Sequence, residues 1–281
     1  MITLSFLLVI LSAILHALWN FATKKVSGNL GILYLGLVFA SALLLPFAVV
    51  FVIRDGMVRT DYVFIIATGV IHSFYFFFLS RAYTHGNISV VYPIARGCGV
   101  VGTAVVAIML LGETVSVTGL TGILCTSLGI LFAGSGRGKS GNYGKGLAYA
   151  FLVGVTMIFY SIIDKMAMAS VHPVIYITGL FLLTMLILAP YVLIRRRGEL
   201  SDALAKYKRN SLLIGVGSAA GYLIILFILQ TARVSYVVAV REVSVALGAV
   251  MGMMFLDEPA FKKKITGIVL IVLGMILIKI S

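Results

Sequence analysis

Two arginines lie inside apolar stretches of this chain, where a charged side chain is costly unless it has a partner or a function. Arg96 follows the apolar start at residue 88 and Arg241 follows a similar start at residue 235. An arginine at such depth needs water, a carboxylate or a ligand anion. We predict that one or both arginines bind an anionic group or control its path. The alternative is a structurally paired arginine, or one that reaches out to the membrane surface.

A second group of polar side chains has the spacing of one helical face. His16, Trp19 and Asn20 stand at positions i, i+3 and i+4, which meet on the same side of a helix. These side chains can shape a pocket and offer hydrogen bonds to a ligand. The same spacing also suits a helix–helix hydrogen bond, or an aromatic side chain near the lipid interface, because Lys24 and Lys25 follow directly. Both interpretations stay open.

Further candidates for the wall of a pocket are aromatic or titratable. His72 and Tyr75 stand among four phenylalanines within residues 72–78, and Tyr160 and Tyr222 lie in two later apolar stretches. His72 titrates near neutrality, so it could relay protons. An ordinary aromatic core with a hydrogen-bonded histidine is the competing interpretation. We include all four residues in the predicted substrate-binding set.

No arrangement of residues in the sequence supports catalysis. We find no paired carboxylates at helical spacing, no His/Glu metal motif and no activated Ser or Cys. Cys98 and Cys125 lie in apolar segments, so we expect neither a disulfide framework nor a metal cluster. Residues 133–140 nearly match a phosphate-binding loop, but they follow a membrane span instead of a strand. We predict no catalytic residue, no metal, no cofactor and no enzyme activity.

The composition is that of a protein dissolved in lipid. Of 281 residues, 61% are apolar and 11% charged, and the mean hydropathy is +1.14. Soluble domains carry about 25% charged residues. The net charge of +13 does not indicate nucleic-acid binding, because the basic residues stand in short runs between apolar stretches. Such runs mark membrane topology and contact anionic headgroups.

The apolar stretches predict ten membrane spans, since a span needs about 20 mostly apolar residues. The first apolar run lacks a basic leader and a cleavage site, so we expect it to be a retained span. The expected spans cover residues 3–23, 30–53, 61–81, 88–111, 115–133, 146–163, 174–194, 211–231, 235–256 and 264–280. The predicted fold class is therefore an all-α integral membrane protein.

The two halves of the chain repeat each other at an offset of 145 residues, since 96 + 145 = 241. Arg96 matches Arg241, Glu113 matches Glu258, and Thr121-Gly122-Ile123 matches Thr266-Gly267-Ile268. We predict a first five-helix repeat in 1–133, a Gly/Ser/basic linker in 134–146 and a second repeat in 147–281. An odd number of spans in each half makes the second copy enter the membrane from the opposite side, so the repeats are inverted.

The distribution of basic residues predicts an orientation. The loops after the first, third, fifth, seventh and ninth spans hold 15 Lys and Arg residues, whereas the other side holds 5. The positive-inside rule places the first group in the cytoplasm, and both termini then face outward.

Several short motifs together resemble the drug/metabolite transporter superfamily, and specifically its EamA-type ten-helix members. They are His16-Ala-Leu-Trp19-Asn20, Tyr92-Pro93-Ile-Ala-Arg96, Leu111-Gly112-Glu113, Arg241-Glu242-Val-Ser244 and Leu256-Asp257-Glu258. The resemblance covers the whole chain. It implies a carrier of small organic solutes with a central cavity between inverted halves, no use of ATP, and both termini in the cytoplasm. The last point conflicts with the charge distribution.

The functional prediction is a secondary transporter that moves a small organic metabolite, an amino acid or another anionic or zwitterionic solute, by alternating access. We expect export across the plasma (bacterial inner) membrane, with proton coupling or substrate exchange as candidate driving forces. The expected partners are the substrate and the lipid bilayer, with no nucleic acid, and the protein is a monomer or homodimer. The alternatives are a multidrug or organic-cation efflux carrier, a lipid-modifying enzyme and a channel.

Overall fold

The computed structural model describes residues 2–25, 29–86, 88–134, 144–255 and 262–281, and these residues form α-helices and no strands. The helices are α1 (Thr3–Lys25), α2 (Leu30–Asp55), α3 (Arg59–His85), α4 (Ile88–Leu111), α5 (Val117–Ala133), α6 (Gly144–Ala167), α7 (Pro173–Arg195), α8 (Arg197–Lys206), α9 (Lys208–Leu229), α10 (Val234–Arg241), α11 (Val243–Phe255) and α12 (Lys262–Ile280).

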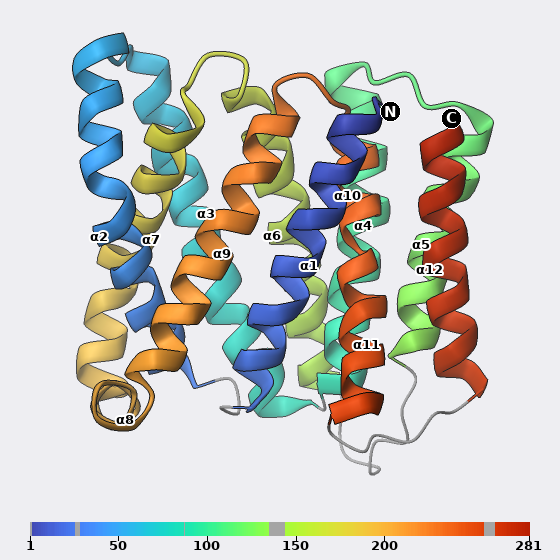
Figure 1. Cartoon of the computed structure of the whole chain (residues 1–281). Coiled ribbons are helices and arrows are strands. Elements are labelled where there is room, and N and C mark those ends of the chain that lie inside the picture. The colour runs from blue at the N-terminus through green and yellow to red at the C-terminus, as the bar shows by residue number, and fades with distance from the viewer. Residues whose placement is uncertain (1, 26–28, 87, 135–143, 256–261) are drawn as a thin grey trace.

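The long helices stand side by side in one bundle, with α2 and α7 at one flank and α5 and α12 at the other (Figure 1). Helices from the two halves of the chain alternate in the packing: α3 and α4 pack on α6, and α1 packs on α9. Both termini lie at the same end of the bundle, and α8 lies at the opposite end (Figure 1). We call these the terminal end and the α8 end.

The helices present apolar surface outward, as a lipid environment requires. Among the described residues, eight stretches are long and apolar enough to cross a membrane, and only 22% to 50% of each is buried. One of them is Val234–Phe255, which comprises α10 and α11. The helix α5 is apolar but shorter. The helix α12 carries Lys262–Lys264 and Lys279 and is not among the eight.

Three differences from the expected spans bear on the functional site. The expected loop after residue 194 contains the amphipathic helix α8. The sixth span extends beyond residue 163 to Ala167. The ninth is interrupted at Glu242, where two backbone bonds join residues three apart, Glu242 N to Ala239 O and Val245 N to Glu242 O. Such a tight turn inside a helix commonly marks a functional position. Most of the expected linker, residues 135–143, lies outside the described residues.

Small residues allow α5 and α12 to touch at the backbone. A Cβ atom on Gly122 would lie 2.8 Å from the carbonyl oxygen of Gly274, and one on Gly129 would lie 2.7 Å from that of Gly267. Both distances are below any normal carbon–oxygen contact. Only glycine therefore permits this approach, which is a common way for helices to associate in membranes.

Candidate functional site

A large cavity lies between the helices in the half of the bundle nearer the α8 end. It holds about 1170 Å³ of space between atoms, its open mouth included. Its lining reaches Asn20 and Leu30, close to the α8 ends of α1 and α2, and Tyr83 and Tyr92, close to those of α3 and α4. The cavity thus extends toward the α8 end, where the two halves of the chain face each other.

All nine residues of the predicted substrate-binding set line this cavity. They are His16, Trp19, Asn20, His72, Tyr75, Arg96, Tyr160, Tyr222 and Arg241. Helical spacing and the rarity of polar groups in apolar segments were the two criteria that selected these residues. The structure shows that the selected residues lie around one cavity. Their role in binding remains a prediction.

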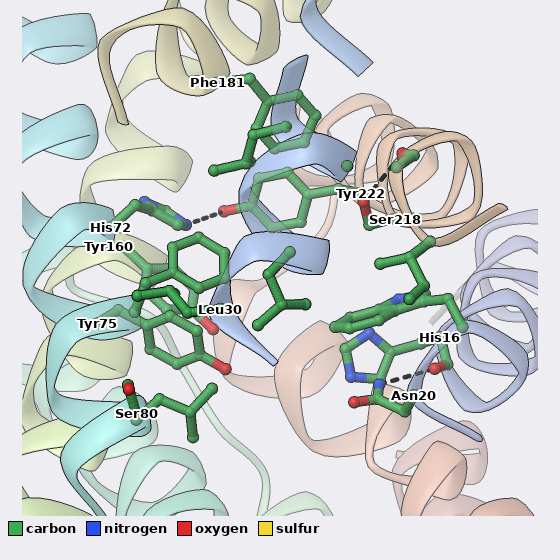
Figure 2. A pocket seen from close by; sticks show the side chains of 18 of the residues that line it. His16, Asn20, Leu30, His72, Tyr75, Ser80, Tyr160, Phe181, Ser218 and Tyr222 are labelled. Atoms are coloured by element: carbon green, nitrogen blue, oxygen red, sulfur yellow. Dashed lines mark hydrogen bonds between the residues drawn. The ribbon is translucent and has the colours of Figure 1, made fainter. Parts of the chain in front are cut away.

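The α1 face predicted from the i, i+3, i+4 spacing forms one side of the cavity. The rings of His16 and Trp19 meet edge to face with centroids 4.9 Å apart. The side chain of Asn20 donates to the His16 carbonyl oxygen over 2.7 Å, as the dashed line in Figure 2 shows. These contacts hold the polar face in place without closing it to a ligand.

An aromatic wall stands across the cavity from that face (Figure 2). The rings of His72 and Tyr160 lie 4.5 Å apart, and those of Tyr75 and Tyr160 lie 6.0 Å apart. Tyr222 completes the wall, with its hydroxyl 3.4 Å from His72 Nε2. Such a wall can pack against an apolar side chain and offer hydroxyl groups at the same time.

Arg96 is a paired arginine, with Glu242 as its partner. Its Nε donates to Glu242 Oε2 over 2.9 Å, and its Nη2 lies 2.5 Å from Oε1. The side chains are 5% and 1% exposed, so both charges are shielded from solvent. The partner comes from the interrupted ninth span, directly after Arg241. Arg96 therefore lines the cavity with its charge already balanced.

Arg241 carries the unbalanced positive charge of the cavity. Its Nη2 lies 3.2 Å from His16 Nδ1, and its guanidinium stands 5.4 Å from the Tyr222 ring centre. No carboxylate of the described residues lies within ion-pair distance of it, and its buried Nε has no hydrogen-bond partner among them. The lining that the structure describes contains two arginines and no Asp or Glu. The cavity is therefore electropositive.

A buried carboxylate that the sequence analysis did not single out lies beside the cavity. Asp164 of α6 is 2% exposed and accepts a hydrogen bond of 2.6 Å from the hydroxyl of Tyr176. It also accepts a short one from the hydroxyl of Tyr222. The expected sixth span ended at residue 163, which placed Asp164 in a loop. Had the expected sixth span been one turn longer, Asp164 would have counted as a charged residue inside the membrane.

Contacts between the two halves join the loop after α4 to the start of α10 at the terminal end of the bundle. The carboxylate of Glu113, in the loop after α4, accepts from Val234 N at 2.6 Å and from the Ser235 hydroxyl at 2.6 Å, which caps the start of α10. In the next loop residues, Ser116 N donates to the Tyr236 hydroxyl at 3.2 Å. Glu113 is thus a carboxylate of the loop between α4 and α5. Its repeat mate, Glu258, lies outside the described residues.

The comparisons with known proteins agree on a class of membrane transporter. Residues 144–280 match the model of the EamA-like transporter family, and residues 32–126 match that of the Small Multidrug Resistance proteins. Both families belong to the drug/metabolite transporter superfamily. The two matches place this chain in that superfamily, with an EamA-like second half. The members of the EamA-like family are transporters.

The fold of this EamA-like transporter also has a solved counterpart. A crystal structure described only as that of a protein superposes with a TM-score of 0.79 at 16% sequence identity, over 100% of this chain and 98% of the other. At that identity the likeness concerns the fold alone. No curated protein sequence matches the chain.

The structure also adds cavity residues that the sequence analysis did not select. Ser80, Tyr83 and Ser218 line the cavity of this EamA-like transporter, as does Tyr92. Tyr92 stood only in the family motif, and nothing in the local pattern distinguished the other three from ordinary interface residues. Their contribution depends on how neighbouring helices rotate, which spacing along one helix does not reveal.

Proposed function

We propose that this protein is a secondary transporter that carries a small anionic or zwitterionic metabolite, such as an amino acid, across the membrane by alternating access. The observation that carries the proposal is the electropositive cavity between the two halves of the chain, with Arg241 as its unbalanced cation. The cavity extends toward the α8 end, while Glu113 and its partners hold the terminal end closed. A carrier resting with one end open has this arrangement.

The architecture we propose is ten spans in two inverted five-helix repeats. The packing supports it, because contacts occur in pairs related by exchange of the halves: α1 with α9 corresponds to α3 with α6, and α2 with α9 corresponds to α3 with α7. The glycines follow the same rule. Gly122 meets Gly274, and Gly129 meets Gly267, although the offset of 145 makes Gly267 the mate of Gly122 and Gly274 the mate of Gly129. This reciprocal pattern is that of a two-fold axis.

The charge of the cavity favours an anionic or zwitterionic substrate over an organic cation. A carboxylate of the substrate would satisfy the unpaired donor of Arg241, and the aromatic wall would receive its apolar part. A cation carrier needs an acidic group that faces its substrate, and the described lining has none. The match of residues 32–126 to Small Multidrug Resistance proteins keeps cation efflux as the alternative.

The setting we propose is a multi-pass protein of the plasma (bacterial inner) membrane, a monomer or homodimer working as an exporter. The α8 end would face the cytoplasm, because α8 and its flanks carry basic residues and basic loops stay inside. The termini would then face outward, against the orientation that family resemblance implies. The cavity of an exporter open at the α8 end would load its substrate from the cytoplasm.

The experiment that tests this function measures ligand binding by the purified protein in detergent. Acetate, L-glutamate, L-leucine and tetraphenylphosphonium would be added to wild type, to Arg241→Gln and to the control Arg233→Gln. The control loses the same charge outside the cavity, where Arg233 contacts Thr114. Thermal unfolding reports binding, since a ligand of the folded state stabilises it. The emission of Trp19, which is the single tryptophan and lines the cavity, reports it independently.

We expect a carboxylate or zwitterion to raise the unfolding temperature of wild type and of Arg233→Gln, followed by saturable counterflow in proteoliposomes. Losing one charge-assisted contact, about 1.5–3 kcal/mol, should weaken binding by roughly 10- to 150-fold in Arg241→Gln. Stabilisation by tetraphenylphosphonium alone, unchanged in Arg241→Gln, would favour the cation-efflux alternative and reject an anion site.

A further inference from the structure

Asp164 lies within the membrane-spanning helix α6 with no cation of the described residues in direct contact. Its side chain is buried, and among the described residues no Lys, Arg or His lies within ion-pair distance of it. The neighbouring Lys165 is occupied elsewhere, because its Nζ donates to the carbonyl oxygens of Leu229 and Ala232 at 2.7 and 2.8 Å. Ionisable groups at such depth commonly mark proton or substrate pathways.

The groups that face Asp164 come from every helix packed around it. The α7 residue Tyr176 and the α9 residue Tyr222 donate their hydroxyls to its two oxygens, and Thr68 of α3 lies 3.5 Å away. His72 of α3 is one step further, in contact with Tyr222. Four further titratable or charged groups line the same small cavity as Asp164: Arg96 of α4, Tyr160 of α6, Arg241 of α10 and Glu242 at the end of α10.

Asp164, Tyr222 and His72 together carry one hydrogen fewer than their hydrogen bonds to one another require. His72 Nδ1 lies 2.9 Å from the carbonyl oxygen of Thr68, which can only accept, so Nδ1 carries a hydrogen. In a neutral imidazole, Nε2 is then an acceptor. The Tyr222 hydroxyl stands between that acceptor and the carboxylate of Asp164, with a single hydrogen for both. One added proton satisfies all three groups.

The added proton has a defined route through the cluster. When it binds the carboxylate oxygen of Asp164, the new O–H donates to the Tyr222 oxygen, and the hydrogen of Tyr222 turns to His72 Nε2. When the proton leaves to water, Tyr222 turns back to the carboxylate. An O–H bond of a hydronium ion breaks as the O–H bond on Asp164 forms, release to water reverses this exchange, and no other bond changes.

This cluster is connected to the substrate cavity. Asp164 lines a small cavity with about 350 Å³ of space between atoms. Tyr160, Tyr222 and Arg241 line both this small cavity and the large one. Tyr222 therefore touches the proton-accepting group on one side and the stacked guanidinium of Arg241 on the other. A change of its hydrogen bond alters the wall that faces the substrate.

We propose that Asp164, Tyr222 and His72 form the proton-binding site of this transporter, and that its proton is exchanged during transport. This assignment rests on the proposed transport function. It names the proton as the ion whose movement is coupled to that of the substrate. The site adjoins the large cavity through Tyr222 and Arg241. It gives the carrier a source of free energy, the proton gradient.

The binding of the proton can be tested without knowing the substrate. Infrared difference spectra of the purified protein, recorded from acidic to alkaline buffer, report the C=O stretch of a protonated carboxylic acid. The variants would be Asp164→Asn, which imitates the protonated form, and Ser161→Ala, a control from the same helix and the same small cavity. We expect a pH-dependent carboxylic-acid band in wild type and Ser161→Ala that is lost in Asp164→Asn. An unchanged band in Asp164→Asn would overturn the assignment.

Coupling is tested in proteoliposomes loaded with the pH dye pyranine, using L-glutamate and L-leucine as probes. We expect their addition to change the internal pH with wild type and Ser161→Ala. Asp164→Asn should lose the pH change, and counterflow of the radiolabelled amino acid is measured in parallel to separate lost coupling from lost transport. Transport by wild type without a pH change would overturn coupling and leave the transport function intact. Should Asp164→Asn fold poorly, Tyr222→Phe replaces it, with the same loss of pH change expected because the relay is cut.

Discussion

Arg96 of α4 and Glu242, at the break between α10 and α11, form a buried ion pair across 146 residues of sequence. Each residue comes from a different half of the chain. A buried pair of this kind does little for net stability, but the loss of one partner leaves an uncompensated charge. The pair therefore fixes how the fourth span meets the interrupted ninth one.

This pair predicts a strong non-additive effect of mutation. Arg96→Gln or Glu242→Gln alone should destabilise the protein by about 3–5 kcal/mol, because the remaining charge has no partner in a dry site. The double variant should regain most of that loss. Thermal or denaturant unfolding of the four proteins in detergent measures the coupling. Additive losses in the double variant would mean that the two charges do not depend on each other.

The glycine contacts between α5 and α12 predict a packing defect when a methyl group is added. Gly122→Ala brings a Cβ to 2.8 Å from the carbonyl oxygen of Gly274, which forces the helices apart. Overpacking of this kind costs about 1–3 kcal/mol. The matched control is Gly248→Ala in α11, where no atom lies within 4 Å of the added Cβ. We expect the control to keep or slightly raise the unfolding temperature, and equal losses in both variants would reject the packing argument.

The sequence predicted the parts of this structure that depend on local pattern. Length and apolarity located the membrane helices, and the rarity of polar groups in them selected nine residues that line one cavity. The i, i+3, i+4 spacing of His16, Trp19 and Asn20 correctly predicted a shared face. These are properties of single helices in lipid, where only the inward face tolerates polar groups.

The rest could not be read from the sequence because it depends on distances between helices. The partner of Arg96 lies on another span, so no spacing rule identifies Glu242. The end of a span is uncertain by several residues, and that error hid Asp164. The helix α8 is polar and short, so the membrane pattern treated it as a loop.

His172, which lies outside the membrane spans at the start of α7, predicts that the stability of the protein depends on pH. His172 caps this helix by accepting from Val174 N at 3.3 Å and stacks on Phe51 at 3.8 Å. Burial holds the pKa of His172 below its usual value of 6.5. The unfolded chain then binds more protons, so the contribution of His172 is complete above pH 6.5 and is lost as the pH falls toward the lower, folded pKa. His172→Asn keeps a capping group that cannot titrate.

Unfolding temperatures measured at a series of pH values in detergent check this sign. Wild type should lose stability below pH 6.5 more steeply than His172→Asn, with the two curves parallel above it. A control variant, His85→Asn, changes another histidine that lies at the end of α3 and does not cap a helix. Parallel curves for wild type and His172→Asn at all pH values would remove His172 from the acid response.

The closed terminal end predicts a gate at Glu113. Its carboxylate accepts from Val234 N, Ser235 N and the Ser235 hydroxyl, and all three donors belong to the start of α10. Alternating access requires that these bonds break when the terminal end opens. A hydrogen bond to a charged group contributes about 1.5–3 kcal/mol, so Glu113→Ala should raise the open population by roughly tenfold or more.

Thiol labelling measures this opening. Ser161→Cys, placed in a Cys98→Ala, Cys125→Ala background, puts a buried thiol on the small cavity beyond the gate. A charged methanethiosulfonate should label it slowly when Glu113 is intact and faster in Glu113→Ala. The control is Thr121→Ala, which removes a hydroxyl of the nearby α5 that bonds only within its own helix at Val117 O. Faster labelling in the control as well would indicate a general loosening of the bundle and contradict the prediction. An effect confined to Glu113→Ala is expected if the hydrogen bonds between Glu113 and the start of α10 hold the two halves together.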